Sequence, residues 1–84
     1  MPYTVIIKKT AQRELDSIPK KIQLRIRGAI ELLAVNPFPP NSKKLKDRDG
    51  YRIRTSDYRI LYNVDGDQLS VMVVRVGHRR DVYR

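Results

Sequence analysis

Three arginines, Arg52, Arg54 and Arg59, lie close together in the sequence and alternate with apolar and aromatic residues. The guanidinium group presents a planar fork of N–H donors that matches the oxygens of a phosphate. If Ser56 and Asp57 form a two-residue turn, the flanking segments pair as a hairpin with Arg54 opposite Arg59. Strand alternation then places all three arginines on one face of the sheet. Because like charges repel directly across a ladder, we expect this face to bind an external anion.

The end of the sequence holds a second group of side chains that can act on a phosphate: His78, Arg79, Arg80 and Tyr83. A third antiparallel strand would return toward the turn at Ser56, so we expect these side chains near the arginines. Histidine is the usual acid or base near neutral pH, and tyrosine can donate a proton or stack on a base. A surface histidine and a tyrosine that anchors the end of the chain in the core are the structural alternatives.

These residue types favour metal-free chemistry on RNA. The sequence has no cysteine and a single histidine, and the expected site has no cluster of carboxylates, so neither a thiolate metal site nor a magnesium site is expected, and no cofactor is implied. Several arginines can stabilise a phosphodiester as negative charge builds in the transition state. In such a reaction the neighbouring 2′-OH attacks phosphorus and an acid protonates the leaving 5′-oxygen, which makes RNA rather than DNA the substrate.

The composition indicates a small basic domain. The chain has 84 residues and a net charge of +9, and 40% of its residues are hydrophobic, too many for a disordered basic tail. We expect one domain over residues 1–84, without a membrane span or signal peptide, located in the cytoplasm. The charge favours a nucleic-acid partner. A solvated basic surface and a patch for an acidic protein are the alternatives.

Periodicity predicts six elements in the order β-α-α-β-β-β. A β-branched segment at residues 3–9 favours a strand. Apolar residues at helical spacing favour two helices, with Thr10 as N-cap of the first and with Pro19 and Asn36 bounding the second. Three more strands are expected at residues 51–55, 58–64 and 69–76, after a basic loop that holds Lys43, Lys44 and Lys46. This order predicts an α+β fold in which a helical hairpin packs on one face of a four-stranded, mostly antiparallel sheet.

Three segments together resemble the RelE/ParE toxin superfamily, and most closely its RelE branch: Tyr51-Arg52-Ile53-Arg54, Tyr58-Arg59-Ile60-Leu61-Tyr62 and the ending Val76-Gly77-His78-Arg79-Arg80-Asp81-Val82-Tyr83-Arg84. The resemblance covers essentially the whole chain. It implies the toxin of a bacterial or archaeal type II toxin–antitoxin pair, with a cognate antitoxin protein that wraps and inhibits it. It also implies an endoribonuclease that cleaves mRNA in the ribosomal A site, so the ribosome and mRNA are further partners.

Carried over by position, the resemblance assigns three residues to the reaction. Arg59 would stabilise the transition state, Arg79 would act as or assist the general acid, and Tyr83 would stack on the mRNA. Arg52 and Arg54 fall where well-known relatives carry a pair of lysines. An arginine stays protonated in proteins, so these two can bind phosphate but cannot serve as bases.

His78 is therefore our candidate for the titrating group, since it lies where those relatives have a basic residue. Arg80 and the lysines of the basic loop, Lys43, Lys44 and Lys46, are expected to bind RNA, the loop by docking on ribosomal RNA. Two other functions stay open: a ParE-like toxin that poisons DNA gyrase, and an RNA-binding module without catalysis. Parallel assays of gyrase supercoiling and of ribosome-programmed mRNA cleavage separate the first from a nuclease.

Overall fold

The structure is a computed structural model, and it describes residues 2–78 of the chain. Its elements are β1 (Thr4–Ile7), α1 (Lys9–Asp16), α2 (Lys20–Val35), β2 (Lys43–Lys44), β3 (Tyr51–Thr55), β4 (Tyr58–Asp65) and β5 (Ser70–His78). The order predicted from the sequence is confirmed, with β2 as an addition.

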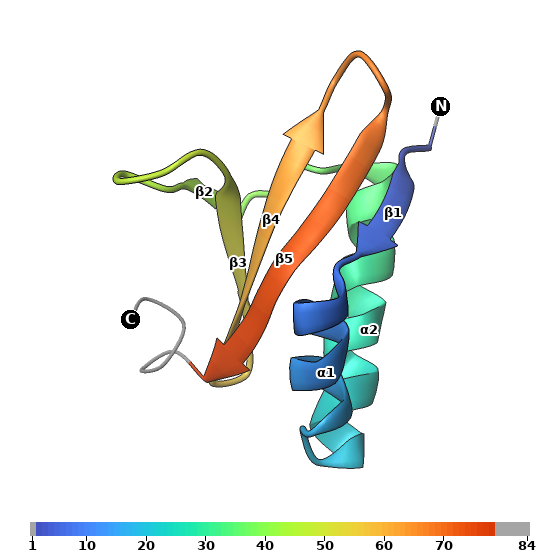
Figure 1. Cartoon of the computed structure of the whole chain (residues 1–84), viewed down its shortest axis with the longest axis vertical. Coiled ribbons are helices and arrows are strands. Elements are labelled where there is room, and N and C mark those ends of the chain that lie inside the picture. The colour runs from blue at the N-terminus through green and yellow to red at the C-terminus, as the bar shows by residue number, and fades with distance from the viewer. Residues whose placement is uncertain (1, 79–84) are drawn as a thin grey trace.

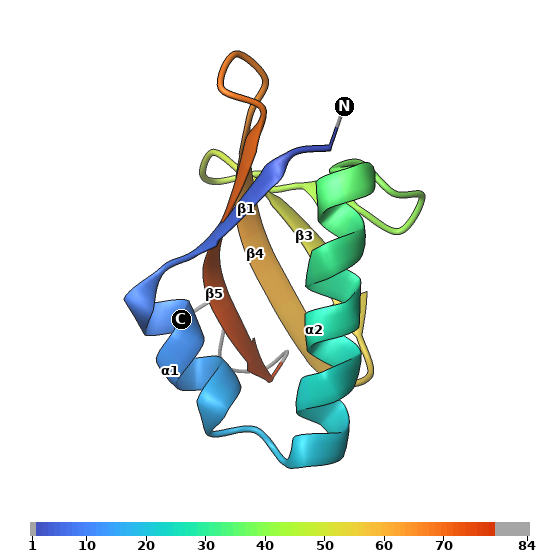
Figure 2. The same cartoon turned by 90° about the vertical axis from the view of Figure 1, so that its right-hand side faces the viewer.

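The strands form one sheet in the order β1-β5-β4-β3-β2, in which β1 runs parallel to β5 and the other neighbours are antiparallel. Both helices lie on the same side of this sheet (Figure 1 and Figure 2). The predicted α+β class is therefore confirmed, whereas the predicted number of four strands is corrected to five. The extra strand pairs Lys43 with Arg52 and Lys44 with Tyr51. Two residues are too few to show a period of alternation, so this strand could not be predicted from the sequence.

The hairpin of β3 and β4 has the predicted register. Thr55 pairs with Tyr58 and Arg54 pairs with Arg59, so the turn consists of two residues. Ser56 in this turn has a φ of 57°, as the tight turns of two-residue hairpins require. The register fixes which side chains of the hairpin face the helices.

The first helix begins earlier than predicted. Lys8, not Thr10, is the N-cap residue, and no side chain caps the helix. The Lys8 N–H donates to the Val73 carbonyl and ends the pairing of β1 with β5, while the Lys8 carbonyl already accepts the N–H of Gln12. The strand therefore passes into the helix without a linker. The helix α2 ends at Asn36 as predicted, whereas Pro19, which was expected in its first turn, is the N-cap residue before it.

The core lies between the helices and the sheet. Its buried members are Ala11, Leu15 and Ile18 near α1, Ile26, Ile30 and Leu33 on α2, and Ile53, Ile60, Tyr62, Val71, Val73 and Val76 on the sheet. The Tyr62 hydroxyl donates to the Pro37 carbonyl at 2.7 Å, which ties the segment after α2 to the sheet. Burial raises the pKa of Tyr62, so this donor stays protonated.

A β-bulge in β5 changes which of its side chains face the helices. Leu61 pairs with Arg75, whereas the next residue of β4 pairs with Val73, so Val74 is an extra residue in β5. Beyond this point the alternation is reversed. Val76 is therefore fully buried in the core, and Arg75 lies on the opposite face of the sheet. This opposite face, which the helices do not cover, is called the open face below.

Candidate nucleic-acid interface

Paired residues of neighbouring strands form two rows on the open face. The first row contains Lys43, Arg52, Leu61 and Arg75, from β2, β3, β4 and β5 in turn. The second row contains Arg54, Arg59 and Gly77, from β3, β4 and β5. Paired residues share a face, and positions two apart on one strand do too, so all seven lie on the same side. The predicted arginine face is present, and it extends over more strands than the hairpin alone.

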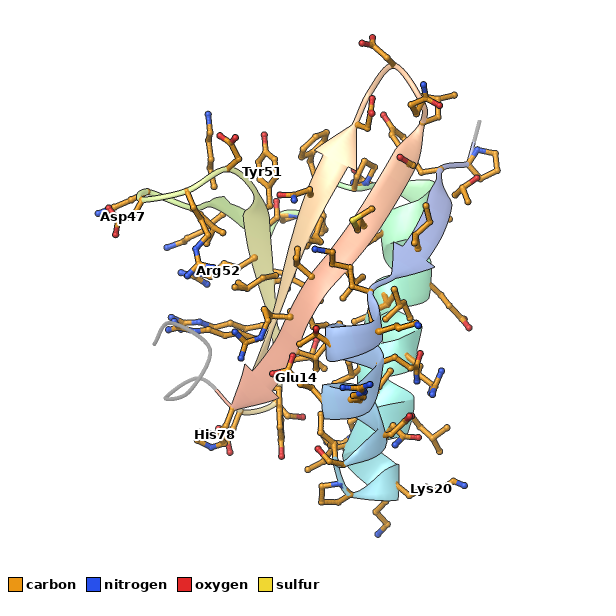
Figure 3. All side chains as sticks on the ribbon, in the orientation of Figure 1. Glu14, Lys20, Asp47, Tyr51, Arg52 and His78 are labelled. Carbon is orange, nitrogen blue, oxygen red and sulfur yellow. The ribbon has the colours of Figure 1, made fainter. Side chains whose placement is uncertain are left out.

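Arg52 and Arg59 belong to a groove of about 560 Å³ whose remaining lining is the segment 43–48. Arg52 extends from β3 on the side of the sheet away from the helices, where this segment also lies (Figure 3). The Nε atom of Arg59 is shielded from solvent, and Leu61 between the cations is only 2% exposed.

The segment 43–50, which contains the predicted basic loop, is held in place at both ends. The Leu45 N–H donates to the Gly50 carbonyl at 2.9 Å, and β2 pairs with β3 just before it. Gly50 has a φ of +122°, and a Cβ at this position would lie 2.5 Å from the Asn63 Oδ1 atom. Only glycine fits this close approach without displacing its neighbours. The sequence suggested separate roles for the loop and the strand arginines, but the structure brings them together in one groove.

Arg75 is a residue of the open face that the sequence analysis did not identify. Its Nε and Nη2 atoms donate to the Glu14 carboxylate of α1 at 2.9–3.1 Å, and the Val76 N–H donates to the same carboxylate at 3.0 Å. These hydrogen bonds raise the pKa of the Arg75 guanidinium. Strict alternation from Val73 would place residue 75 in the core. The bulge cannot be recognised in the sequence, so the position of Arg75 on the open face could not be predicted.

The end of β5 reaches the arginines as predicted, but the ring of His78 does not join them. Gly77 pairs with Arg59, whereas His78 pairs with Tyr58. The rings of His78 and Tyr58 lie 5.7 Å apart in an edge-to-face arrangement, and Tyr58 packs against the core. The imidazole lies at the very end of β5 (Figure 3), and its ring contact is with Tyr58 rather than with the arginines.

Three other predicted site residues, Arg79, Arg80 and Tyr83, lie outside the described residues. Within residues 2–78, no group of three or more histidine, cysteine, aspartate or glutamate side chains is arranged to hold a metal ion. None of the helices described in this range is long and apolar enough to cross a membrane.

Residues 5–83 match the family model described as the ParE toxin of type II toxin–antitoxin systems. The chain belongs to the RelE/ParE toxin superfamily. Its curated relatives favour the RelE name: it is 34% identical to the toxin RelG of Mycobacterium tuberculosis over 86 residues, covering 100% of this chain and 99% of that protein. It is also 34% identical to a putative RelE-like toxin protein of Escherichia coli, covering 99% of this chain and 92% of that protein.

Solved structures of toxin–antitoxin complexes contain the same fold. The RelBE2 complex from Mycobacterium tuberculosis matches with a TM-score of 0.82 and 33% identity, over 94% of this toxin and 100% of the matched chain. The archaeal RelE–RelB complex from Pyrococcus horikoshii OT3 matches with a TM-score of 0.84 and 28% identity, over 98% and 100% of the two chains. The predicted membership of the superfamily is thereby confirmed.

Proposed function

We propose that this toxin is a metal-free endoribonuclease that cleaves mRNA on the ribosome. The observation that carries the proposal is the groove in which Arg52 and Arg59 meet the lysines of the segment 43–48. Cations fixed on a sheet can stabilise a phosphodiester without reorganising when negative charge develops, and this is usually a large part of catalysis. The relatives named RelE and RelG support the RelE type of activity over an unrelated one.

The roles within the reaction are those that the resemblance to the RelE branch implies. The 2′-OH gives its proton to water while its oxygen forms a bond to phosphorus, the bond to the 5′-oxygen breaks, and a proton is delivered to that leaving oxygen. Arg59 would bind the non-bridging oxygens in the transition state, and Arg52 and Arg54 would hold the neighbouring phosphates as bidentate donors. Arg79 would assist the general acid by holding the water that protonates the leaving group, and Tyr83 would stack on a base.

His78 is the weakest member of the proposed site. Its ring packs edge-to-face on Tyr58 and is not among the residues that line the groove. Rate enhancement from positioning and charge stabilisation does not require a titrating side chain at this position. We therefore retain His78 as the residue to be tested, and assign the chemistry to the arginines and Tyr83.

Other partners follow from charge. Lys43, Lys44 and Lys46 extend the groove and would bind mRNA or ribosomal phosphates, together with Arg80. A cognate antitoxin would neutralise the net charge of +9, and the solved RelB–RelE complexes of the relatives support such a partner. We propose that residues 1–84 act as one domain, in the cytoplasm, where the ribosome is found.

Arg59→Ala tests the proposal, with Arg13→Ala as the control. Both variants lose one positive charge, but Arg13 is exposed on α1, away from the groove. We expect Arg59→Ala to lower ribosome-programmed mRNA cleavage by at least about 100-fold, because a preorganised charge at the transition state is lost. Arg13→Ala should cleave normally. Normal cleavage by Arg59→Ala contradicts the proposal.

A second assay addresses the gyrase alternative, which the ParE description of the matched family favours. Purified toxin is added to a supercoiling reaction with DNA gyrase and, in parallel, to ribosomes programmed with mRNA. We expect cleavage of mRNA and unchanged supercoiling. Inhibition of gyrase without mRNA cleavage would assign the toxin to the ParE activity instead.

A further inference from the structure

Arg75 is a cation of the first row that lies outside the arginine groove. It pairs with Leu61 on β5, whereas Lys43 and Arg52 line the groove from β2 and β3. Neighbouring strands lie about 4.8 Å apart, so the row spreads its three cations over roughly 14 Å, across the strands rather than along them. No member of the row is acidic. The row therefore continues the positive surface of the groove to β5.

Glu14 holds the Arg75 guanidinium in one orientation. Its carboxylate accepts hydrogen bonds from the Nε and Nη2 atoms at 2.9–3.1 Å, and it also accepts the Val76 N–H at 3.0 Å. Glu14 lies between β5 and α1 (Figure 3), so it is anchored at both ends. An arginine that rotates freely loses side-chain entropy when a ligand immobilises it. Arg75 has already lost much of this entropy in the folded toxin.

The contacts with Glu14 leave part of the guanidinium available. A guanidinium has five N–H donors, and the Nη1 atom of Arg75 has no hydrogen-bond partner among residues 2–78. The side chain is 34% exposed, and hydrogen bonding to Glu14 raises its pKa, so its positive charge is permanent. Arg75 thus presents fixed N–H donors on a charged group, which suits a phosphate oxygen.

An ion pair that only joins α1 to β5 is the alternative explanation. Such pairs occur elsewhere in the helical layer, since Arg27 and Asp16 lie 3.7 Å apart with both side chains exposed. Arg75 differs in two respects. It lies in one row with Arg52, on the face that carries the groove. In addition, both carboxylate oxygens of Glu14 already accept N–H groups, which weakens their repulsion of a phosphate.

We propose that Arg75 binds a further phosphate of the RNA substrate, outside the groove, and that Glu14 is the positioning residue that orients it. The RNA would then leave the groove across β4 and β5, toward α1, and not along the strands. Because Arg75 lies two strands from Arg52, it contributes to substrate binding and not to the reacting phosphate. This inference rests on the RNA substrate of the proposed function, but not on cleavage.

The test compares the wild-type toxin with the double variant Glu14→Gln, Arg75→Gln. The net charge stays at +9, so a loss of affinity cannot come from the overall charge. The glutamine at position 14 can still accept the Val76 N–H, so the variant should fold. The probe is a single-stranded RNA with 2′-O-methyl groups, which lacks the attacking 2′-OH and stays intact. It is titrated by fluorescence anisotropy at several salt concentrations.

We expect the Kd of the double variant to rise by about tenfold, because a charge-assisted hydrogen bond to a phosphate is lost. The slope of log Kd against the logarithm of the salt concentration should fall by about 0.7, the value for one phosphate contact on a single strand. This change of slope identifies a contact with RNA, since a purely structural role of Arg75 would not produce it.

The matched control is Asp16→Asn combined with Arg27→Gln. It also removes an ion pair between two elements without a change of net charge, but that pair joins α1 to α2, away from the open face. The control should bind RNA within about twofold of wild type, with the same salt slope. Arg75→Lys keeps the charge and loses the planar fork, so it should raise the Kd by about threefold and retain the slope. It decides the question if the double variant does not fold.

Three outcomes overturn the proposal. The first is a double variant, or Arg75→Lys in its place, with the Kd and salt slope of wild type, and the second is an equal loss of affinity in the control. The third is a wild-type toxin that does not bind the RNA. Cleavage on programmed ribosomes is measured separately. A toxin that binds RNA through Arg75 but does not cleave mRNA refutes the proposed nuclease and leaves this inference intact.

Discussion

Glu14 is the residue that joins the open face to the helical layer. Its carboxylate accepts hydrogen bonds from the Arg75 guanidinium and from the Val76 N–H, beyond the point where β1 stops pairing with β5. Its carboxylate thus lies at the edge of β5 where a residue of a longer β1 would otherwise pair with this strand. The same contacts hold the last part of β5, which leads to Gly77 opposite Arg59.

We predict that Glu14→Ala lowers the free energy of unfolding by about 1–2 kcal/mol, because a partly shielded ion pair and a backbone acceptor are lost together. Asp16→Ala is the control: Asp16 also forms an ion pair, with Arg27, but at 3.7 Å and with both side chains more exposed. It should change stability by less than about 0.5 kcal/mol. Urea denaturation of both variants measures the change in the free energy of unfolding. Equal losses of stability would show that Glu14 contributes no more than an exposed ion pair.

His78 permits a second prediction at this scale. Its ring packs on Tyr58, and it is not among the residues that line the groove. We expect His78→Gln to keep the single-turnover cleavage rate within about threefold of wild type, with an unchanged pH profile. A loss of the acidic limb of that profile would instead restore His78 as the titrating group and place RNA around the end of β5.

At the scale of elements, β2 and the segment that follows it form the wall of the groove. The wall depends on Gly50, whose positive φ and close approach to Asn63 leave no room for a side chain. Gly66, in the turn between β4 and β5, has open space around it and no positive φ. The two glycines therefore form a natural pair for comparison.

Gly50→Ala should destabilise the toxin by about 1–3 kcal/mol, because the backbone must leave its conformation or displace Asn63. The same variant should bind RNA more weakly, since the lysines of the segment 43–48 shift with it. Gly66→Ala should be neutral within about 0.5 kcal/mol. Thermal melts and RNA titrations measure the stability and the RNA affinity of the two variants. If both quantities are the same in the two variants, Gly50 does not hold the wall of the groove.

The elements also show what the sequence could predict. The register of β3 with β4 followed from a two-residue turn and a period of two, both of which are local. The strand β2 and the bulge at Val74 are not local features: β2 exists only because Arg52 and Tyr51 pair with it, and the bulge is defined by β4. For this reason the hairpin arginines could be predicted, while Arg75 and the contribution of the loop to the groove could not.

At the scale of the whole molecule, charge and size determine how the toxin meets its partners. A net charge of +9 on 84 residues is a strong and long-ranged attraction for RNA and for an acidic protein alike.

The final prediction concerns the stability of the complex. A ligand that binds only the folded toxin adds about 4 kcal/mol at a thousandfold excess over its Kd. For a domain of this size each kcal/mol raises the Tm by about 4–8 °C, so a saturated complex should melt roughly 15–30 °C above the free toxin. Because opposite charges contribute to binding, this increase should shrink as salt is added. Scanning calorimetry of toxin with and without antitoxin measures it, and equal melting temperatures at saturation would contradict a partner that binds the folded state.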